Sequence, residues 1–209
     1  MADLAAISEK LQKGRRDEVG EMVEAAVAEG VPVRQILDEA LISAMAEVGE
    51  KFKKNEVYVP EMLIAARAMQ RALDILTPHM VKEGIDPVGK VVIGTVKGDL
   101  HDIGKNLVGM MLTGGGLKVV DIGTDVPAEK FVESCKAEGA QVCAMSALLT
   151  TTMPQMADVV KAMKAAGIAT KTIIGGAPVT QSYADEIGAD GYAPDAASAA
   201  DVTKQLMGV

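Results

Sequence analysis

The sequence has few aromatic residues and few cysteines, and each shortage narrows the choice of fold and function. Phe, Trp and Tyr make up 2% of the 209 residues, so aliphatic side chains and 13 methionines must fill the interior. Methionine is flexible and adapts to irregular gaps in a core. Cys135 and Cys143 have neither metal-ligand nor redox-motif spacing, and so few thiols fit a reducing compartment. We assign neither cysteine a functional role.

Excess positive charge and long apolar runs are also lacking. The formal net charge is -8, so nucleic-acid phosphates and anionic membranes would be repelled over most of the surface. No apolar run approaches the ~20 residues that span a bilayer. The N-terminal residues lack the continuous apolar segment of a signal peptide. These features predict a cytoplasmic protein whose main partners are neither nucleic acids nor membranes.

The first part of the chain has the periodicity of amphipathic helices. Apolar residues recur at helical spacing, and Gly14 and Gly30 are typical helix stop signals. Helices are expected over residues 3–13, 16–28, 32–52 and 60–81. Helices joined by short turns are typical of an antiparallel bundle. Residues 1–87 are therefore predicted to form a four-helix bundle domain.

From Lys90 onward, short apolar runs alternate with helical patterns. Strands are expected at 91–96, 118–122, 141–145, 172–174 and 191–192, and helices at 103–114, 127–138, 151–166, 180–187 and 196–207. Such regular alternation is typical of parallel strands, because these need crossover connections. Residues 88–209 are therefore predicted to form an α/β domain with an open five-stranded parallel sheet, Rossmann-like or flavodoxin-like, and helices on both faces.

The loop after the first predicted strand holds the most informative residues. Asp99 stands two positions before His101, and a carboxylate so placed can orient an imidazole that binds a metal ion. One histidine cannot hold a metal ion by itself, and no cysteine pair or HExxH motif accompanies it. On these residues alone, a structural hydrogen bond between the two side chains is the simpler interpretation. If His101 is a ligand, the metal ion must bring its other ligands with it, as in a macrocycle.

Further polar residues and glycines follow the later predicted strands. Ser146 follows the third strand and Gly175-Gly176 the fourth, so with His101 they lie at the carboxyl edge, where open α/β sheets bind ligands. Taken singly, Ser146 could be a helix N-cap and the glycine pair a strand-to-helix turn. Their convergence on one edge favours a ligand site, in which the glycines let a bulky group approach the backbone.

These residues together resemble a known signature. Asp99-x-His101-x-x-Gly104, followed by Ser146-x-Leu148 and Gly175-Gly176, is similar to the cobalamin-binding domain of methyltransferase corrinoid proteins and of cobalamin-dependent methionine synthase. The resemblance covers roughly residues 30 to 200. It implies a bound corrinoid such as methylcobalamin, whose cobalt is held from below by His101, and a helical bundle that shields the upper face.

The resemblance also implies roles for individual residues. Asp99 would orient the His101 ring and Ser146 would hydrogen-bond to Asp99, so that proton uptake by these three residues is coupled to methyl transfer. The other positions that match corrinoid-contacting residues are Gly98, Asp102, Ile103, Gly104, Leu148, Thr150, Gly175, Gly176 and Ala196, with Tyr58, Val59 and Met62 at the end of the bundle nearest the ligand.

The function that the resemblance implies is that of a methyl carrier rather than a complete enzyme. A substrate-specific methyltransferase would load the cobalt, and a second methyltransferase would pass the methyl group to tetrahydrofolate or coenzyme M. A reductive activation protein would be a further partner. A cobalamin-dependent sensor is the alternative, although a DNA-binding sensor needs a basic helix-turn-helix module, for which Arg15-Arg16 is too little. The small subunit of an adenosylcobalamin mutase would share the histidine loop but not the bundle.

Overall fold

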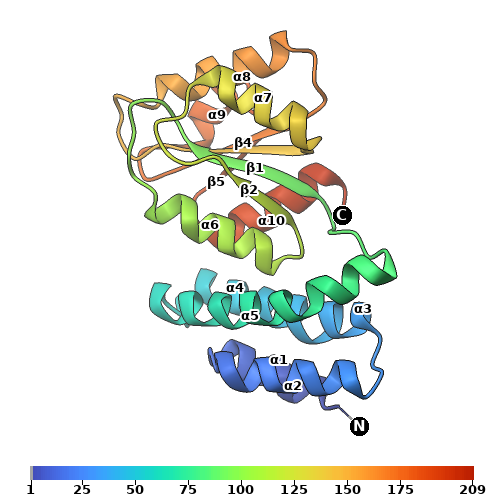
Figure 1. The fold of residues 1–209 in the computed structure, drawn as a ribbon. Helices are drawn as coiled ribbons and strands as arrows, with labels where there is room; N and C mark the ends of the chain where they lie inside the picture. The colour runs from blue at the N-terminus through green and yellow to red at the C-terminus, as the bar shows by residue number, and fades with distance from the viewer. Residues whose placement is uncertain (1) are drawn as a thin grey trace. The chain divides into compact units, whose positions relative to one another are not determined.

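The computed structural model describes residues 2–209 and confirms the predicted fold class, a helical N-terminal part followed by a five-stranded parallel sheet with helices (Figure 1). By its internal contacts the chain divides into two compact units. One extends to Pro87 and includes Gly114–Gly116, and the other comprises Val88–Thr113 and Leu117–Val209. None of the helices within residues 2–209 combines the length and the apolar character that a membrane crossing requires.

The helical unit is built from amphipathic helices whose apolar sides form its core. The predicted helix over 32–52 is present, but its middle turns are π-helical, which the apolar periodicity did not indicate. The elements are α1 (Leu4–Gln12), α2 (Arg16–Ala28), α3 (Val33–Gln35), η1 (Ile36–Ile42), α4 (Ser43–Lys53) and α5 (Val59–Glu83). Its largest fully buried side chains are Ile7, Leu11, Ile36, Leu41, Met45, Met62, Met69 and Leu76.

The second unit is a parallel sheet in the strand order β2-β1-β3-β4-β5, which is the flavodoxin-like order. The strands are β1 (Lys90–Thr95), β2 (Lys118–Asp121), β3 (Val142–Ser146), β4 (Lys171–Gly175) and β5 (Gly191–Ala193). The helices are α6 (Ile103–Gly114), α7 (Ala128–Glu138), α8 (Pro154–Ala165), α9 (Gln181–Ile187) and α10 (Ala196–Met207). Helices α6 and α10 cover one face of the sheet, and α7, α8 and α9 cover the other (Figure 1).

This topology creates a switch point between two neighbouring strands. The chain leaves β1 toward α6 on one face, whereas it leaves β3 toward α8 on the opposite face (Figure 1). At such a point the two loops diverge at the carboxyl edge, which is where open α/β sheets hold ligands. The loop after β3 is longer than predicted, because α8 begins at Pro154 rather than at residue 151. Proline suits the first turn of a helix, because the backbone N–H groups of that turn have no acceptor within the helix and proline has no N–H.

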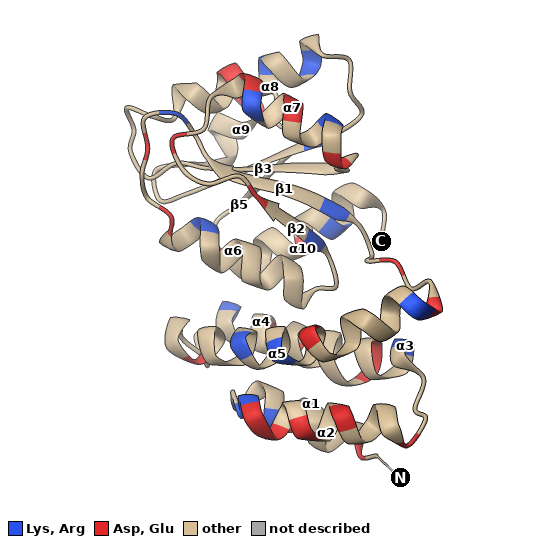
Figure 2. Cartoon of the chain, in the orientation of Figure 1, with Lys and Arg blue, Asp and Glu red and all other residues tan. Residues whose placement is uncertain are grey.

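Helix α6 carries a single charged residue, Lys105, whereas acidic and basic residues are interspersed on most other helices (Figure 2). Lys105 is 3% exposed and forms an ion pair with Asp121 at the end of β2. Its Nζ also donates to Asn106 Oδ1 at 2.7 Å. A buried lysine stays charged only when it is paired. This ion pair therefore fixes the first turn of α6 against β2. That turn directly follows the loop that contains Asp99 and His101.

We predict that the core between the sheet and α7 depends on Phe131. This side chain is fully buried, and its ring lies directly over Gly94 of β1, where an added Cβ would come within 2.9 Å of it. Phe131→Ala should lower the free energy of unfolding by about 3–5 kcal/mol, because it leaves a cavity. The exposed neighbour Lys130 provides the control, and Lys130→Ala should change it by less than about 0.5 kcal/mol in the same urea titration. Equal effects of the two substitutions would contradict this packing.

Candidate functional site

Two loops at the carboxyl edge of the sheet form the candidate site. One follows β1 and contains residues 96–102, and the other follows β3 and contains residues 147–153. The strands are neighbours in the sheet, with Thr95 paired with Ser146 at their ends. Because the strands are parallel, both loops leave the same edge and lie close enough for side chains of one to reach the backbone of the other.

The loop after β1 folds back immediately after the strand. The amide of Asp99 donates to Val96 O at 3.1 Å, and Gly98 has a φ of +81°, which glycine adopts without steric cost. At the other end of the loop, Thr95 Oγ1 donates to His101 O at 2.8 Å. The Asp99 side chain is thereby fully buried, whereas that of His101 is 51% exposed.

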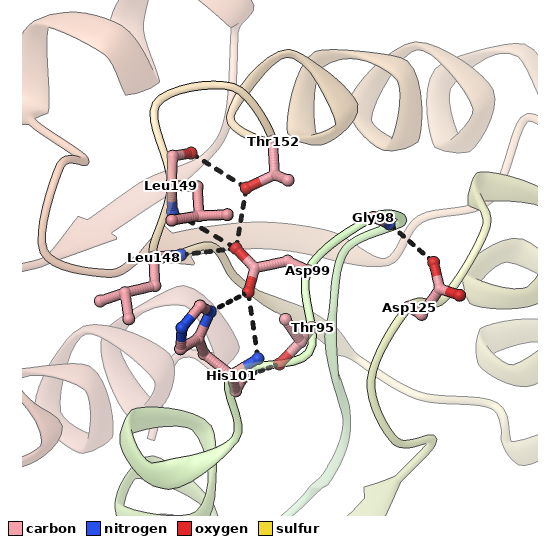
Figure 3. A network of polar contacts seen from close by, with 8 residues as sticks. All are labelled: Thr95, Gly98, Asp99, His101, Asp125, Leu148, Leu149 and Thr152. Carbon is pink, nitrogen blue, oxygen red and sulfur yellow. Dashed lines mark hydrogen bonds and ion pairs between the residues drawn. The ribbon is translucent and has the colours of Figure 1, made fainter.

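The buried carboxylate of Asp99 accepts hydrogen bonds from both loops (Figure 3). Oδ1 accepts from the amide of His101 at 3.1 Å and contacts its ring Nδ1 at 2.7 Å. Oδ2 accepts from the amide of Leu148 at 2.8 Å, from that of Leu149 at 3.4 Å and from Thr152 Oγ1 at 2.7 Å. Both oxygens are therefore satisfied by donors from the protein itself.

These donors decide the charge of Asp99. Burial alone raises the pKa of a carboxyl group, but the hydrogen bonds from Leu148, Thr152 and His101 outweigh it and hold the pKa of Asp99 well below its usual range. The side chain is consequently ionised at neutral pH. Because an ionised carboxylate can only accept, the neutral His101 ring must carry its proton on Nδ1.

The other ring nitrogen of His101 is then available to a ligand. Nε2 of the neutral ring presents a lone pair, and it has no hydrogen-bond partner within the described residues 2–209. A neutral imidazole held in this tautomer by a carboxylate is the usual arrangement of a metal-binding histidine. No group of three or more His, Cys, Asp or Glu side chains in the described part of the chain could hold a metal ion by itself.

The hydroxyl group that contacts Asp99 belongs to Thr152, so the predicted hydrogen bond from Ser146 was wrong. Ser146 is the last residue of β3, where its neighbours in the sheet are Thr95 and Gly175. Thr152 lies six residues later, in the turn in which its amide donates to Leu149 O at 3.1 Å. The sequence offers a hydroxyl at each of positions 150, 151 and 152. That run was the available signal, but only the folded turn shows which of the three points at Asp99.

Exposed apolar side chains stand beside the half-exposed histidine. Leu100 and Ile103, from the loop after β1 and the start of α6, are 74% and 76% exposed. Leu148 and Leu149, from the loop after β3, are 43% and 41% exposed. Large apolar residues concentrated at one edge are typical of a binding surface rather than of a solvated loop. They suit a broad and partly apolar ligand above the imidazole.

Close contacts within the chain itself explain why two glycines stand at the end of β4. Gly176 has a φ of +132°, and a Cβ added there would lie 1.9 Å from Ala147 O. A Cβ on Gly175 would lie 3.0 Å from Ala193 O. Both residues therefore allow the backbone to pass closely beside its neighbours, as a strand-to-helix turn requires. Gly104 differs, because a Cβ added there would meet no atom within 4 Å apart from its chain neighbours and the nearby backbone of its own helix.

The structure places the remaining predicted residues as follows. Gly98 and Asp102 lie in the loop after β1 and Thr150 in the loop after β3, and all three are exposed. Ala196 is buried at the start of α10, directly after the N-cap Asp195. In the helical unit, Tyr58 and Val59 are exposed at the start of α5, whereas Met62 is 1% exposed.

Known proteins with similar sequences point to one family. Two family models match the chain, and both are described as B12 binding domains, one over residues 89–201 and the other over residues 4–77. A corrinoid protein of Desulfitobacterium hafniense is 38% identical over 213 residues, covering 100% of this chain and 99% of that protein. A trimethylamine corrinoid protein of Methanosarcina barkeri is 43% identical over 198 residues, covering 92% of this chain and 91% of that protein.

Solved structures include one of similar architecture over nearly the whole chain. A chain of the methanol:cobalamin methyltransferase complex of Methanosarcina barkeri matches with a TM-score of 0.87 and 29% identity. The match covers 97% of this chain and 79% of that chain.

We predict that Thr152 helps to keep Asp99 ionised. Thr152→Val removes a hydrogen bond to a buried charge and should cost about 1.5–3 kcal/mol of unfolding free energy at neutral pH. The lowered pKa of Asp99 gives the fold a stabilisation that is complete above the ordinary aspartate value, about 3.9, and that is lost only as the pH falls on through the lowered pKa of the folded state. The variant's deficit should therefore shrink in acid.

The measurement for Thr152 is urea unfolding at pH 7 and in a series of acid pH values that continues well below the ordinary aspartate pKa, with Thr152→Ser as the matched control. Serine keeps the hydroxyl group and should stay close to wild type at every pH. A deficit of Thr152→Val that stays the same down to the acid end of the series would contradict a role in stabilising the charge of Asp99.

We also predict that Gly176 tolerates no side chain. Gly176→Ala should cost several-fold more stability than Gly139→Ala. Gly139 has a φ of +61°, and a Cβ added there would meet nothing within 4 Å. The cost of alanine at this position is therefore mainly the strain of the positive φ, about 1 kcal/mol of unfolding free energy. Thermal unfolding of both variants measures the difference. Similar losses would show that the loop beside Ala147 moves aside readily.

Proposed function

The chain belongs to the B12-binding domain family, and from this premise we propose that it carries a methyl group on a bound corrinoid from a substrate-specific methyltransferase to a second methyltransferase. Corrinoid binding is the shared property of the relatives named above. They are corrinoid proteins and a chain of a methyltransferase complex, which supports a carrier over a sensor.

The observation that carries the proposal is the state of His101. Its Nδ1 is held 2.7 Å from the buried Asp99 carboxylate, and its Nε2 has no partner within residues 2–209. A single protein nitrogen can serve a metal ion whose other ligands come from a macrocycle. The apolar side chains beside the ring, those of Leu100, Ile103 and Leu148, suit the flat face of such a macrocycle. The residues present therefore fit a corrinoid.

When a corrinoid is bound, its cobalt supplies the centre that accepts and releases the methyl group. His101 would hold the cobalt through Nε2, while Asp99 keeps the ring in one tautomer and one orientation. Thr152 and the amides of the loop after β3 keep Asp99 ionised.

We propose that further residues contact the corrinoid, as the family resemblance implies. Glycines at 98, 104, 175 and 176 would leave room for it, and Gly104 supports this best because the protein's own packing does not require a glycine there. The other proposed contacts are Asp102, Ile103, Ser146, Leu148, Thr150 and Ala196. A role for Tyr58, Val59 and Met62 in covering the cofactor stays a prediction.

The finer assignments rest on the family resemblance. We propose tetrahydrofolate or coenzyme M as the methyl acceptor and a reductive activation protein as an additional partner. The methyl donor would be bound by the partner methyltransferase. A trimethylamine corrinoid protein and a chain of a methanol:cobalamin methyltransferase complex both resemble this chain, so its fold is compatible with partners for different donors.

The test is an ultraviolet-visible spectrum of the protein reconstituted with methylcobalamin. Wild type should show a corrinoid whose own base is displaced and whose cobalt is bound by a histidine, and His101→Ala should lose this signature and bind methylcobalamin more weakly. The chain's second histidine provides the matched control, because His79 lies in α5 of the helical unit, and His79→Ala should leave the spectrum unchanged. Identical spectra for wild type and His101→Ala would refute the proposal.

A further inference from the structure

The loop after β2 supports the loop after β1, which carries Asp99 and His101 and is called the histidine loop below. It does so on the side away from Thr152. Residues 123–126 of the loop after β2 run beside the end of β1. Thr95 N donates to Gly123 O at 2.9 Å, and Val126 N donates to Thr95 O at 3.0 Å. Between these two contacts stands Asp125, which is solvent-exposed and forms no part of the predicted site.

Asp125 forms two hydrogen bonds with consecutive residues of the histidine loop. Its Oδ1 accepts from the amide of Gly98 at 2.7 Å (Figure 3). Its own amide donates to Asp99 O at 2.9 Å. The side chain and the main chain of one residue thus hold the backbone from which the Asp99 carboxylate projects. That carboxylate in turn holds the imidazole of His101.

The backbone of Asp125 has a conformation that most side chains avoid. Its φ is +55°. Within residues 2–209, Asn55 is the only other non-glycine residue with a positive φ. Glycine would adopt this conformation without strain, so an aspartate there costs free energy that glycine would avoid. Its carboxylate offsets that cost by accepting the Gly98 amide.

We propose that Asp125 is a positioning residue for His101. By fixing Gly98 and Asp99 from the β2 side, it restricts the loop to the arrangement in which the imidazole would bind the metal. The loop is then held at three places: at Gly98 and Asp99 by Asp125, at the Asp99 carboxylate by the loop after β3, and at His101 O by Thr95. This inference deepens the proposed function and rests on it for the ligand's identity.

Three substitutions of Asp125 distinguish the effect of its side-chain hydrogen bond from the effect of its positive φ. Asp125→Gly removes the acceptor and relieves the strain of positive φ. Asp125→Asn keeps an oxygen acceptor and tolerates the same φ. Asp125→Ala removes the acceptor and keeps the strain. If the side-chain hydrogen bond positions the loop, the asparagine variant should match wild type, and the glycine and alanine variants should both show a looser loop.

The first measurement needs no cofactor. Amide hydrogen exchange in the full-length protein, followed by NMR, should be about 2- to 10-fold faster at the His101 amide in Asp125→Gly than in wild type, the factor expected for one lost hydrogen bond. Exchange in β1 should be unchanged, which excludes a general loss of stability. An unchanged rate at His101, or an equal acceleration throughout β1, would overturn the proposal.

The second measurement uses methylcobalamin as the probe. The histidine-ligated fraction in the visible spectrum at neutral pH should correspond to a ligation constant about 2- to 10-fold lower in Asp125→Gly and unchanged in Asp125→Asn. Equal losses in both variants would overturn the proposal, because negative charge rather than the acceptor would then matter. If wild type shows no histidine ligation, the proposed function fails, and the exchange measurement still decides whether Asp125 orders the loop.

Discussion

The buried carboxylate of Asp99 is the interaction on which the site depends. An unpaired charge at this depth would be costly, so the surrounding chain must supply donors to both oxygens. It does so from two loops: the amide and ring of His101 on one side, and the turn that contains Leu148 and Thr152 on the other. Because those donors keep Asp99 ionised, the tautomer of His101 follows from elementary hydrogen-bond chemistry.

The sheet topology makes this arrangement possible. Asp99 and Thr152 are 53 residues apart in the chain, and they meet only because β1 and β3 are neighbouring parallel strands with a shared carboxyl edge. The helices that follow these strands lie on opposite faces, so their loops diverge and leave the His101 ring half exposed. The negative charge of Asp99 is therefore buried next to His101, while Nε2 of the His101 ring remains accessible.

Close backbone approaches are the second constraint on this edge of the sheet. Gly176 passes so near Ala147 that no side chain fits, and Asp125 accepts a strained φ while it bonds to Gly98. These contacts are made between atoms of the protein itself, so they restrict the loops. Preorganised loops lose less conformational freedom on binding, which favours a ligand site over a merely exposed edge.

The sequence by itself determined the features that local spacing controls. Helical periodicity and short apolar runs predicted the helical bundle and the five parallel strands, and the two-residue separation of Asp99 and His101 was enough to predict their contact. The tertiary structure decided what depends on distant segments. It selected Thr152 over Ser146 as the hydroxyl at Asp99, and it brought Asp125 to Gly98. The physical reason is that a turn's direction and the neighbour of a strand arise from packing across the whole sheet, which no local pattern of residues encodes.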